Sequence, residues 1–313
     1  MKITKENNLC TFVIPVHIEE NNLEGLEFFK QAMNSIFKQT CQEWSVVLVN
    51  DHSKNRFLDE YVNRITSQQK QPIIYNHNAS NLGAGCSRNI GIEIAYKSGS
   101  NIILFQDADD LSHPRRVEVT KEVFQTQNVD VVYSPFIPVD EYGNEIEPEK
   151  FPHHIKYIIA NNNDPSVGRD VWKIIAAKKM YINLTSTTSV RIDVARNVPF
   201  PNKRSSEDSY TWMLYSAYGA VFHFIKEIPS KYRIPQTLKG TSLSTSIGKD
   251  NFYQDFAETH MEAYFECTKA ALEKGTITQD EMKKLTSLVY SNLFDVLREA
   301  GMYELADMYT YKN

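Results

Sequence analysis

The stretch Asn101-Ile-Ile-Leu-Phe-Gln106-Asp107-Ala108-Asp109-Asp110 runs from an apolar, strand-like segment into three carboxylates within four positions. Burying such a strand is ordinary, but ending it on this much negative charge is costly unless a positive group lies there. In an open α/β sheet, ligands bind at the carboxyl ends of the strands. The stretch therefore predicts a divalent metal ion held against a phosphorylated ligand.

Further apolar segments lie on both sides of this stretch and alternate with amphipathic helices. The predicted strands are residues 10–16, 44–49, 72–75, 101–105 and 129–133, and the predicted helices are 23–37, 57–65, the segment ending near 95, and 114–124. Strands that alternate with helices favour a mostly parallel sheet covered by helices. The predicted fold class is therefore α/β.

The pattern changes beyond Ser134. A turn at 140–144 predicts a hairpin, and the polar, poorly periodic stretch 151–169 predicts a surface excursion. Acids after Ser205 predict the start of a helix that ends near Tyr218. The remaining predicted elements are extended pieces at 181–190, 220–224 and 228–234, and long helices at 252–272 and 279–297 that we expect to pack on the body.

Composition limits the class of protein. The 313 residues, 42% hydrophobic and 23% charged, are typical of a globular protein with one large domain or one domain and an appendage. A net charge of −5 gives no support for nucleic-acid binding. The sequence shows neither a membrane-spanning run nor a signal-peptide pattern. Four scattered cysteines predict buried thiols in a reducing compartment, so we expect a cytoplasmic protein.

The spacing of Asp107 and Asp109 suits metal binding. In extended backbone, side chains two positions apart point the same way. Two hard oxygen ligands suit Mg²⁺ or Mn²⁺, which accept water and phosphate oxygens as their other ligands. The alternative is that these acids only cap the helix that follows. We expect Asp110 to shape the turn toward the helix near Pro114.

Three further places combine a polar loop with a charged side chain. Asp51 follows the second strand and could accept a hydrogen bond from a nucleobase N–H, or could cap a helix. The glycines of 81–91 could admit a diphosphate with Arg88 as its counter-charge, or this could be a helix start with a surface arginine. Asp208 could be a general base, or an acid that only complements the helix dipole.

Four motifs, in order, resemble those of inverting nucleotide-sugar glycosyltransferases of family 2, which have the GT-A fold. The resemblance covers residues 10 to about 225. The motifs are Phe12-Val-Ile-Pro15-Val16-His17, with His17 where tyrosine is usual; Val49-Asn50-Asp51-His52-Ser53, with Asn50 where aspartate is usual; Asn81-Leu-Gly83 with Ser87-Arg88-Asn89-Ile-Gly91; and Phe105-Gln-Asp107-Ala108-Asp109-Asp110 with Pro114.

The resemblance implies a role for each matching position. Asp109 would bind the Mn²⁺ or Mg²⁺ that bridges the donor diphosphate, and Asp107 would contact metal, ribose or both. Asp51 would bind a uracil ring, which favours a UDP-sugar donor, and Asp208 would be the catalytic base. The remaining expected donor-binding positions are Pro15, His17, Gly83, Arg88 and Ala108. Tyr232-Arg233 and Ser242-Leu-Ser244 are similar to a family segment that closes over the donor.

The resemblance also implies a division of the chain and a set of partners. Residues 1–240 would form the GT-A domain, with a nucleotide-sugar half (1–134) and an acceptor and catalytic-base half (135–240). Residues 241–313 lie beyond the resemblance and are predicted from their own pattern to be a helical extension, which could bind the acceptor, contact the inner face of a membrane peripherally, or form a homodimer. The acceptor would be a glycan or lipid-linked molecule in polysaccharide biosynthesis.

Two alternatives differ from this interpretation. A sugar nucleotidyltransferase would carry a glycine-rich loop with Arg and Lys after the first strand, where this chain has Pro15-Val-His-Ile-Glu19-Glu20. A catalytically inactive, nucleotide-sugar-binding scaffold of the same fold would not need the acids Asp107, Asp109 and Asp208. Measured turnover would distinguish the enzyme from the scaffold.

Overall fold

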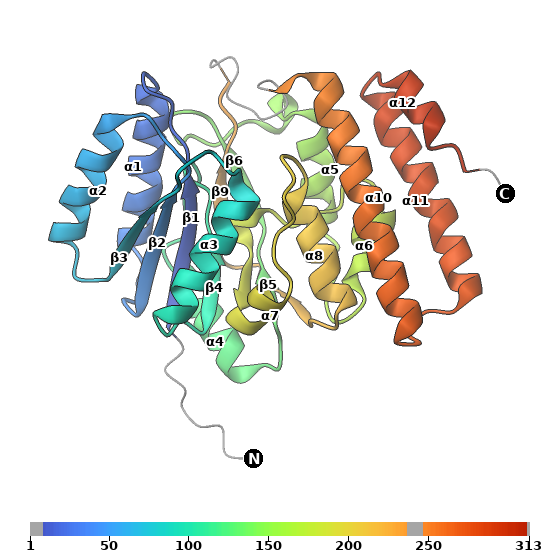
Figure 1. Ribbon diagram of the computed structural model, residues 1–313, viewed down its shortest axis with the longest axis horizontal. Helices are drawn as coiled ribbons and strands as arrows, with labels where there is room; N and C mark the ends of the chain where they lie inside the picture. Colours follow the sequence, from blue (N-terminus) through green and yellow to red (C-terminus); the bar gives the residue numbers. More distant parts are fainter. Residues whose placement is uncertain (1–8, 237–246, 312–313) are drawn as a thin grey trace.

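The computed structural model describes residues 9–236 and 247–311. A seven-stranded sheet in the order β3-β2-β1-β4-β7-β5-β8 lies at its centre (Figure 1). Its strands are β1 (Cys10–Val16), β2 (Trp44–Asn50), β3 (Ile73–His77), β4 (Ile102–Phe105), β5 (Val131–Tyr133), β7 (Ser189–Arg191) and β8 (Phe222–Phe224). All pairs are parallel except those of β7, which runs antiparallel to β4 and β5. The predicted mostly parallel α/β sheet is confirmed.

Helices cover both faces of this sheet because side chains alternate along each strand. Phe12, Ile14 and Val16 of β1 belong to one core, whereas Val13 belongs to the other. The first core includes α1 (Leu23–Phe37), α2 (Arg56–Gln68) and α4 (Arg116–Thr126). The second includes α3 (Ala84–Lys97), α6 (Val171–Ala177), α7 (Ile192–Asn197), α8 (Glu207–Ala217), α10 (Lys249–Glu273), α11 (Gln279–Glu299) and α12 (Tyr303–Met308).

Gly91 lets α3 lie close to the sheet. A Cβ atom at this position would lie only 2.5 Å from Cγ1 of Val13 on β1. A larger residue would therefore push α3 away from the strands, because packed interiors do not absorb extra methyl groups freely. The close approach fixes the start of α3 beside the carboxyl ends of β1 and β2.

A two-stranded parallel sheet joins the second half of the chain to the first. It pairs β6 (Phe136–Val139) with β9 (Ser230–Arg233), and an isolated bridge links Lys231 of β9 to Leu111. After β6 the chain turns, with Asp140 N–H donating to the Asn144 carbonyl at 2.9 Å. The predicted turn at 140–144 is confirmed, and β9 is brought beside the acids that follow β4.

Two predictions, for residues 151–169 and 181–190, are wrong. The segment 151–169 is not simply a surface excursion, because it contains α5 (His153–Asn161), whose Ile155 and Ile158 are buried against Phe136. Only the end of 181–190 is a strand, and a 3-10 turn (Thr185–Thr187) precedes it. Helices α6 and α7, like the final α12, are short and have little periodicity of their own. Tertiary contacts decide such segments more than local propensity does.

The C-terminal helices pack on the body, as expected. Helix α10 contacts α8, and α11 contacts α6 and α12 (Figure 1). A capping box between Thr278 and Glu281 sets the start of α11. Within residues 9–236 and 247–311, no helix is long and apolar enough to cross a membrane. The predicted domain boundary at 240 and the segment Ser242–Ser244 lie outside the described residues, and the division of the chain stays a prediction.

Candidate active site

The loops after β1 and β2 meet through Asp51. Its buried carboxylate accepts hydrogen bonds from the backbone N–H groups of Leu82 and Gly83, both at 2.8 Å, and from Nδ2 of Asn78 at 2.9 Å. The Nδ1 atom of His17 lies 2.8 Å from the Asp51 carbonyl oxygen. A carboxylate offers about four acceptor positions, so Asp51 holds the loop before α3 and keeps room for one further donor.

The remaining predicted positions of these loops lie at the same edge of the sheet. Pro15 is buried near the end of β1, next to Val49 of β2. Gly83 precedes α3 with a φ of +86°, in the region that favours glycine. Its N–H group is committed to Asp51, so Gly83 shapes this loop through that bond. Ala108 is half-buried after β4 and packs against the core of the first face.

The acids after β4 lie in a turn. Strand β4 ends at Phe105, and the N–H group of Asp110 donates to the Asp107 carbonyl at 3.4 Å. The prediction that Asp107 and Asp109 share an extended segment is therefore wrong. The two carboxylates are nevertheless close enough to repel each other. Desolvation of the Asp109 carboxyl, with the charge of Asp107 second, raises its pKa to about 6.

Asp110 links the turn to the second half of the chain. It is 1% exposed, and its carboxylate accepts from Oγ of Ser186 at 2.5 Å and from the Arg233 N–H at 2.9 Å. Burial raises its pKa well above the usual range, and the charges of Asp109 and Asp107 add to this shift. Asp110 therefore does more than shape the turn, because it connects β4 to β9.

Arg88 joins two acids from distant parts of the sequence. Its Nη2 donates to Oδ1 of Asp107 and its Nη1 donates to Oε1 of Glu207, both at 2.7 Å. Only 4% of the Arg88 side chain is exposed, so the interpretation that it is a surface arginine is wrong. Burial would lower its pKa, but the two carboxylates raise that pKa above its ordinary value.

Asp208 lies in the first turn of α8, where the predicted helix start is confirmed. Its Oδ1 accepts from the Ser209 N–H at 2.7 Å, and its Oδ2 accepts from Oγ1 of Thr185 at 3.3 Å. Desolvation raises the pKa of Asp208 to about 7, and the neighbouring charge of Glu207 adds to it. A carboxylate with a pKa near neutrality suits general-base chemistry.

Two further cations lie near these acids; Arg116 was not predicted, and Arg233 was named only as part of a segment that closes over the donor. Arg116 is 1% exposed and donates to the carbonyl oxygens of Phe105 at 2.8 Å and Thr188 at 3.0 Å. Arg233 donates from Nε to the Asp109 carbonyl oxygen at 2.8 Å. Arg116 lies two positions after Pro114, and Arg233 lies in a motif that suggested a donor-closing segment. The sequence around Arg116 or Arg233 does not show that the arginine is buried, or which oxygen atoms it bonds.

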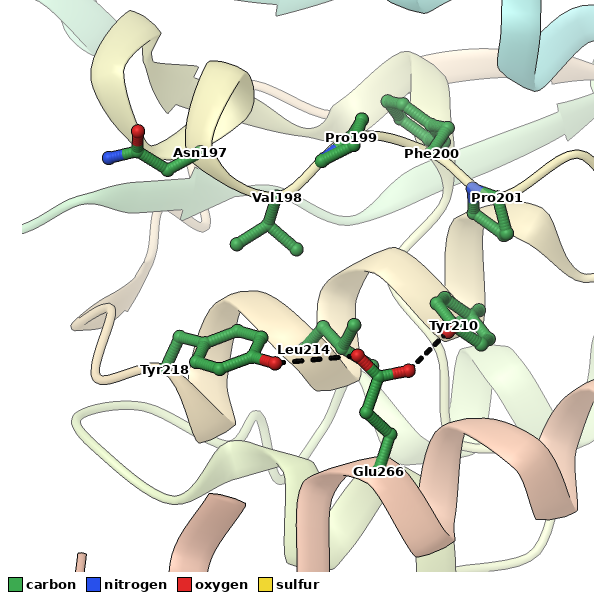
Figure 2. A pocket seen from close by; sticks show the side chains of 9 residues that line it. All are labelled: Asn197, Val198, Pro199, Phe200, Pro201, Tyr210, Leu214, Tyr218 and Glu266. Carbon is green, nitrogen blue, oxygen red and sulfur yellow. Dashed lines mark hydrogen bonds between the residues drawn. The ribbon is translucent and has the colours of Figure 1, made fainter. Parts of the chain in front are cut away.

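A pocket of about 450 Å³ lies beside α8, separate from these acids (Figure 2). The segment 197–201 forms one wall, and Tyr210 and Leu214 of α8, with Tyr218 just after that helix, form the other. The hydroxyl groups of Tyr210 and Tyr218 both point at Glu266 of α10 and donate to its carboxylate, at 2.5 and 3.3 Å. Neither Asp109 nor Asp208 lines this pocket, so it is distinct from the acidic site.

Metal-ligating side chains are few at the acidic site. Across the part of the chain that the structure describes, no three His, Cys, Asp or Glu residues converge as a metal cage. None of the four cysteines forms a disulfide; Cys10 and Cys267 are buried as predicted, whereas Cys41 and Cys86 are only half-buried. A cation at this site would therefore depend on Asp109 and Asp107 together with oxygens from a ligand.

Comparison with known proteins bears on this arrangement. A family model described as glycosyl transferase family 2 matches residues 11–184, more than half of the chain. An uncharacterized glycosyltransferase of Methanocaldococcus jannaschii is 27% identical over 217 residues, 68% of each chain. The bifunctional glycosyltransferase pgtA of Dictyostelium discoideum is 28% identical over 136 residues, which cover 42% of this chain and 18% of that protein.

Two solved structures share the fold over nearly the whole chain. The S. aureus TarS fragment 1–349 in complex with UDP-GlcNAc has a TM-score of 0.59 at 14% identity, covering 96% of this chain and 88% of that one. The mannosyltransferase PcManGT from Pyrobaculum calidifontis, in complex with GDP-Man and Mn²⁺, has a TM-score of 0.57 at 12% identity. That match covers 97% of this chain and 76% of the mannosyltransferase.

Proposed function

The chain belongs to glycosyl transferase family 2, and on this premise we propose that it moves a sugar, with inversion, from a nucleoside diphosphate sugar to an acceptor hydroxyl. We infer a UDP-sugar as the donor and a glycan or lipid-linked molecule as the acceptor. The observation that carries the proposal is the pair of acidic groups joined by Arg88. The solvent-facing Asp109 beside Asp107 would serve the donor, and Asp208, with a pKa near 7, would serve the acceptor.

The charges at the site fit a divalent cation. Carboxylates outnumber guanidinium groups there, and the raised pKa values of Asp110, Asp109 and Asp208 reflect burial together with the charges of neighbouring acids; the groups are Asp107, Asp109, Asp110, Glu207, Asp208, Arg88, Arg116 and Arg233. A cation would offset the desolvation of Asp109 and the repulsion from Asp107, which together raise its pKa. Asp109 and Oδ2 of Asp107 would hold Mn²⁺ or Mg²⁺. When bound, the ion supplies positive charge for the leaving diphosphate.

In the proposed reaction, each residue of the site would have its own role. Asp208 accepts the proton of the acceptor hydroxyl while the hydroxyl oxygen forms a bond to the anomeric carbon. The bond from that carbon to the diphosphate oxygen breaks, and its electron pair leaves with the nucleoside diphosphate. Thr185 and the Ser209 N–H hold the Asp208 carboxylate in place. Asp51 and His17 would contact the nucleoside.

A donor panel tests the proposed function. With Mn²⁺ or Mg²⁺, we expect the protein to release nucleoside diphosphate from one member of a panel of UDP- and GDP-sugars, and to transfer the sugar to a glycan or lipid-linked acceptor. Thermal shift identifies the donor first, because a ligand that binds the folded state raises its stability. Nucleotide binding with no release from any donor would favour the inactive scaffold. The cytoplasmic location, peripheral membrane contact and homodimer stay predictions.

The pH dependence follows from the two raised pKa values. Asp208 is an active base only when ionised, so kcat/KM should fall as the pH drops through about 7. Asp109 loses its charge at lower pH, around 6, so metal-dependent donor binding should persist after transfer has declined. Measuring kcat/KM and the calorimetric Kd for UDP with Mn²⁺ between pH 5 and 9 on the same samples separates the two steps. A kcat/KM that stays constant from about pH 8 to 6 would contradict the role of Asp208.

A further inference from the structure

Arg88 connects the two functional halves of the site. It lies on α3, yet its guanidinium group bonds Asp107 after β4 and Glu207 at the start of α8, 119 positions away. We propose that Arg88 is a positioning residue, and that with Glu207 as its anchor it holds the catalytic-base helix α8 at a set distance from the metal-binding turn. This inference rests on the proposed function of Asp107, Asp109 and Asp208.

The shape of the guanidinium group suits this role. Its N–H groups form a rigid planar fork, so two carboxylates bound to different nitrogens are held at a fixed spacing. A lysine would offer a single flexible point charge instead. The two bonds of Arg88 are equally short at 2.7 Å, and they come from two different nitrogens, Nη1 and Nη2. The Arg88 fork therefore sets the spacing between Asp107 and Glu207.

Neighbouring contacts fix Arg88 in turn. Its guanidinium carbon lies 5.3 Å from the centre of the Phe200 ring. The next residue, Asn89, exchanges two hydrogen bonds of 2.9 Å with the backbone of Phe200. Phe200 also forms part of the wall of the pocket beside α8 (Figure 2). Helix α3 is thus clamped to the segment that leads into α8.

The start of α8 lacks the usual device that fixes a helix end. Ser206, the residue before it, has a φ of +59°, in a region that non-glycine residues rarely adopt, and it makes no side-chain capping bond. The side-chain bond from Thr185 to Asp208 is long, at 3.3 Å. The bond between Glu207 and Arg88 is much shorter and comes from the residue next to Asp208. Together with the 2.7 Å bond from the Ser209 N–H to Asp208 itself, it fixes the position of the base.

The same geometry opposes a direct donor contact by Arg88. Both terminal nitrogens are already bonded to carboxylates, and the side chain is 4% exposed. Its Nε is buried and has no partner among the described residues, so it does not face the solvent either. The predicted role of Arg88 as a counter-charge for the diphosphate would require these bonds to break.

Kinetics of four variants test the inference: Arg88→Met, Arg88→Lys, Glu207→Gln and the double variant Arg88→Met/Glu207→Gln. We expect the Met and Gln variants each to lower kcat by about 10- to 100-fold, because small misplacements of reacting groups carry costs of that order. The Kd for UDP with Mn²⁺ should rise less than about threefold. The double variant should be no slower than the slower single variant, since both remove one interaction. Arg88→Lys should recover part of the lost kcat.

The matched control is Arg196→Met, which breaks the more exposed pair between α7 and Glu93 of α3. It should leave kcat and Kd unchanged. A rise in the Kd of Arg88→Met above tenfold with an unchanged kcat would overturn the inference in favour of a donor contact. Additive losses in the double variant would overturn it as well. If Arg88→Met does not fold, the isosteric Glu207→Gln alone decides, through its kcat and Kd.

Amide hydrogen exchange separates failure of this inference from failure of the proposed function. It needs no turnover, so it reports on Arg88 even if the wild type transfers no sugar. We expect exchange of the hydrogen-bonded amides near the start of α8, residues 210–213, to rise at least about tenfold in Arg88→Met and Glu207→Gln but not in Arg196→Met. Unchanged exchange there would overturn the positioning role. Asp208→Asn, assayed in parallel, reports on the proposed function independently.

Discussion

Asp208→Asn is expected to abolish sugar transfer, lowering kcat by about 10²- to 10⁴-fold, the range for loss of a general base. The amide has the same shape as the carboxylate, so its oxygen can still accept from the Ser209 N–H or from Thr185. It cannot accept a proton from the acceptor hydroxyl. Metal-dependent binding of UDP should be unchanged, because Asp208 does not contact the donor in the proposed scheme.

Steady-state kinetics and calorimetry on the same preparation measure these two outcomes. The matched control is Asp193→Asn, which changes an exposed acid in the first turn of α7 and should alter neither quantity. If Asp208→Asn keeps more than a tenth of the wild-type kcat, another group is the base. If it loses UDP binding as well, Asp208 acts on the donor and the division between the two acidic groups is wrong.

Asp109→Ala is expected to remove the metal dependence of donor binding. The Kd for UDP with Mn²⁺ or Mg²⁺ should rise about 100-fold or more, because a bound cation contributes several kcal/mol to interactions with phosphate oxygens. Desolvation and the charge of Asp107 both disfavour the ionised carboxylate of Asp109, so its loss removes an unfavourable charge and should not unfold the protein. The expected loss therefore concerns binding and not stability.

Calorimetric titration of UDP with and without the metal ion measures this loss. Asp295→Ala, which removes an exposed acid on α11, serves as the control and should bind UDP like the wild type. Metal-dependent UDP binding that persists unchanged in Asp109→Ala would show that the ion is held elsewhere. Asp107→Asn should show a smaller effect, since one of its oxygens is already bonded to Arg88.

The proposed scheme for these two acidic groups rests on a fold that solved structures share. The likeness in structure to TarS and PcManGT extends over the sheet and the C-terminal helices of this chain. Both of those proteins were solved with nucleotide sugars, one of them with Mn²⁺. Their low identity to this chain shows the shared fold alone. The donor sugar and the metal of this protein therefore depend on the panel and the titrations above.

Elements with a strong local pattern were predicted correctly from the sequence. The strand 10–16, the helix 23–37 and the long helix 279–297 each carry enough periodic apolar residues to specify a buried face, and the structure confirms them as β1, α1 and α11. The local pattern did not identify helix α5, and it did not give the bounds of strand β7. They are short, and their burial depends on Phe136, β4 and β5, which lie far away in the sequence.

The same distinction holds for the candidate site. By itself, the sequence determined the fold class, the family and the acids that follow β4 and begin α8, because these follow from local pattern and from motifs. Only the tertiary structure decided that Arg88 is buried between Asp107 and Glu207, and that Asp51 holds the N–H groups of Leu82 and Gly83. Contacts between distant residues depend on how helices and strands pack, and no local pattern encodes that packing.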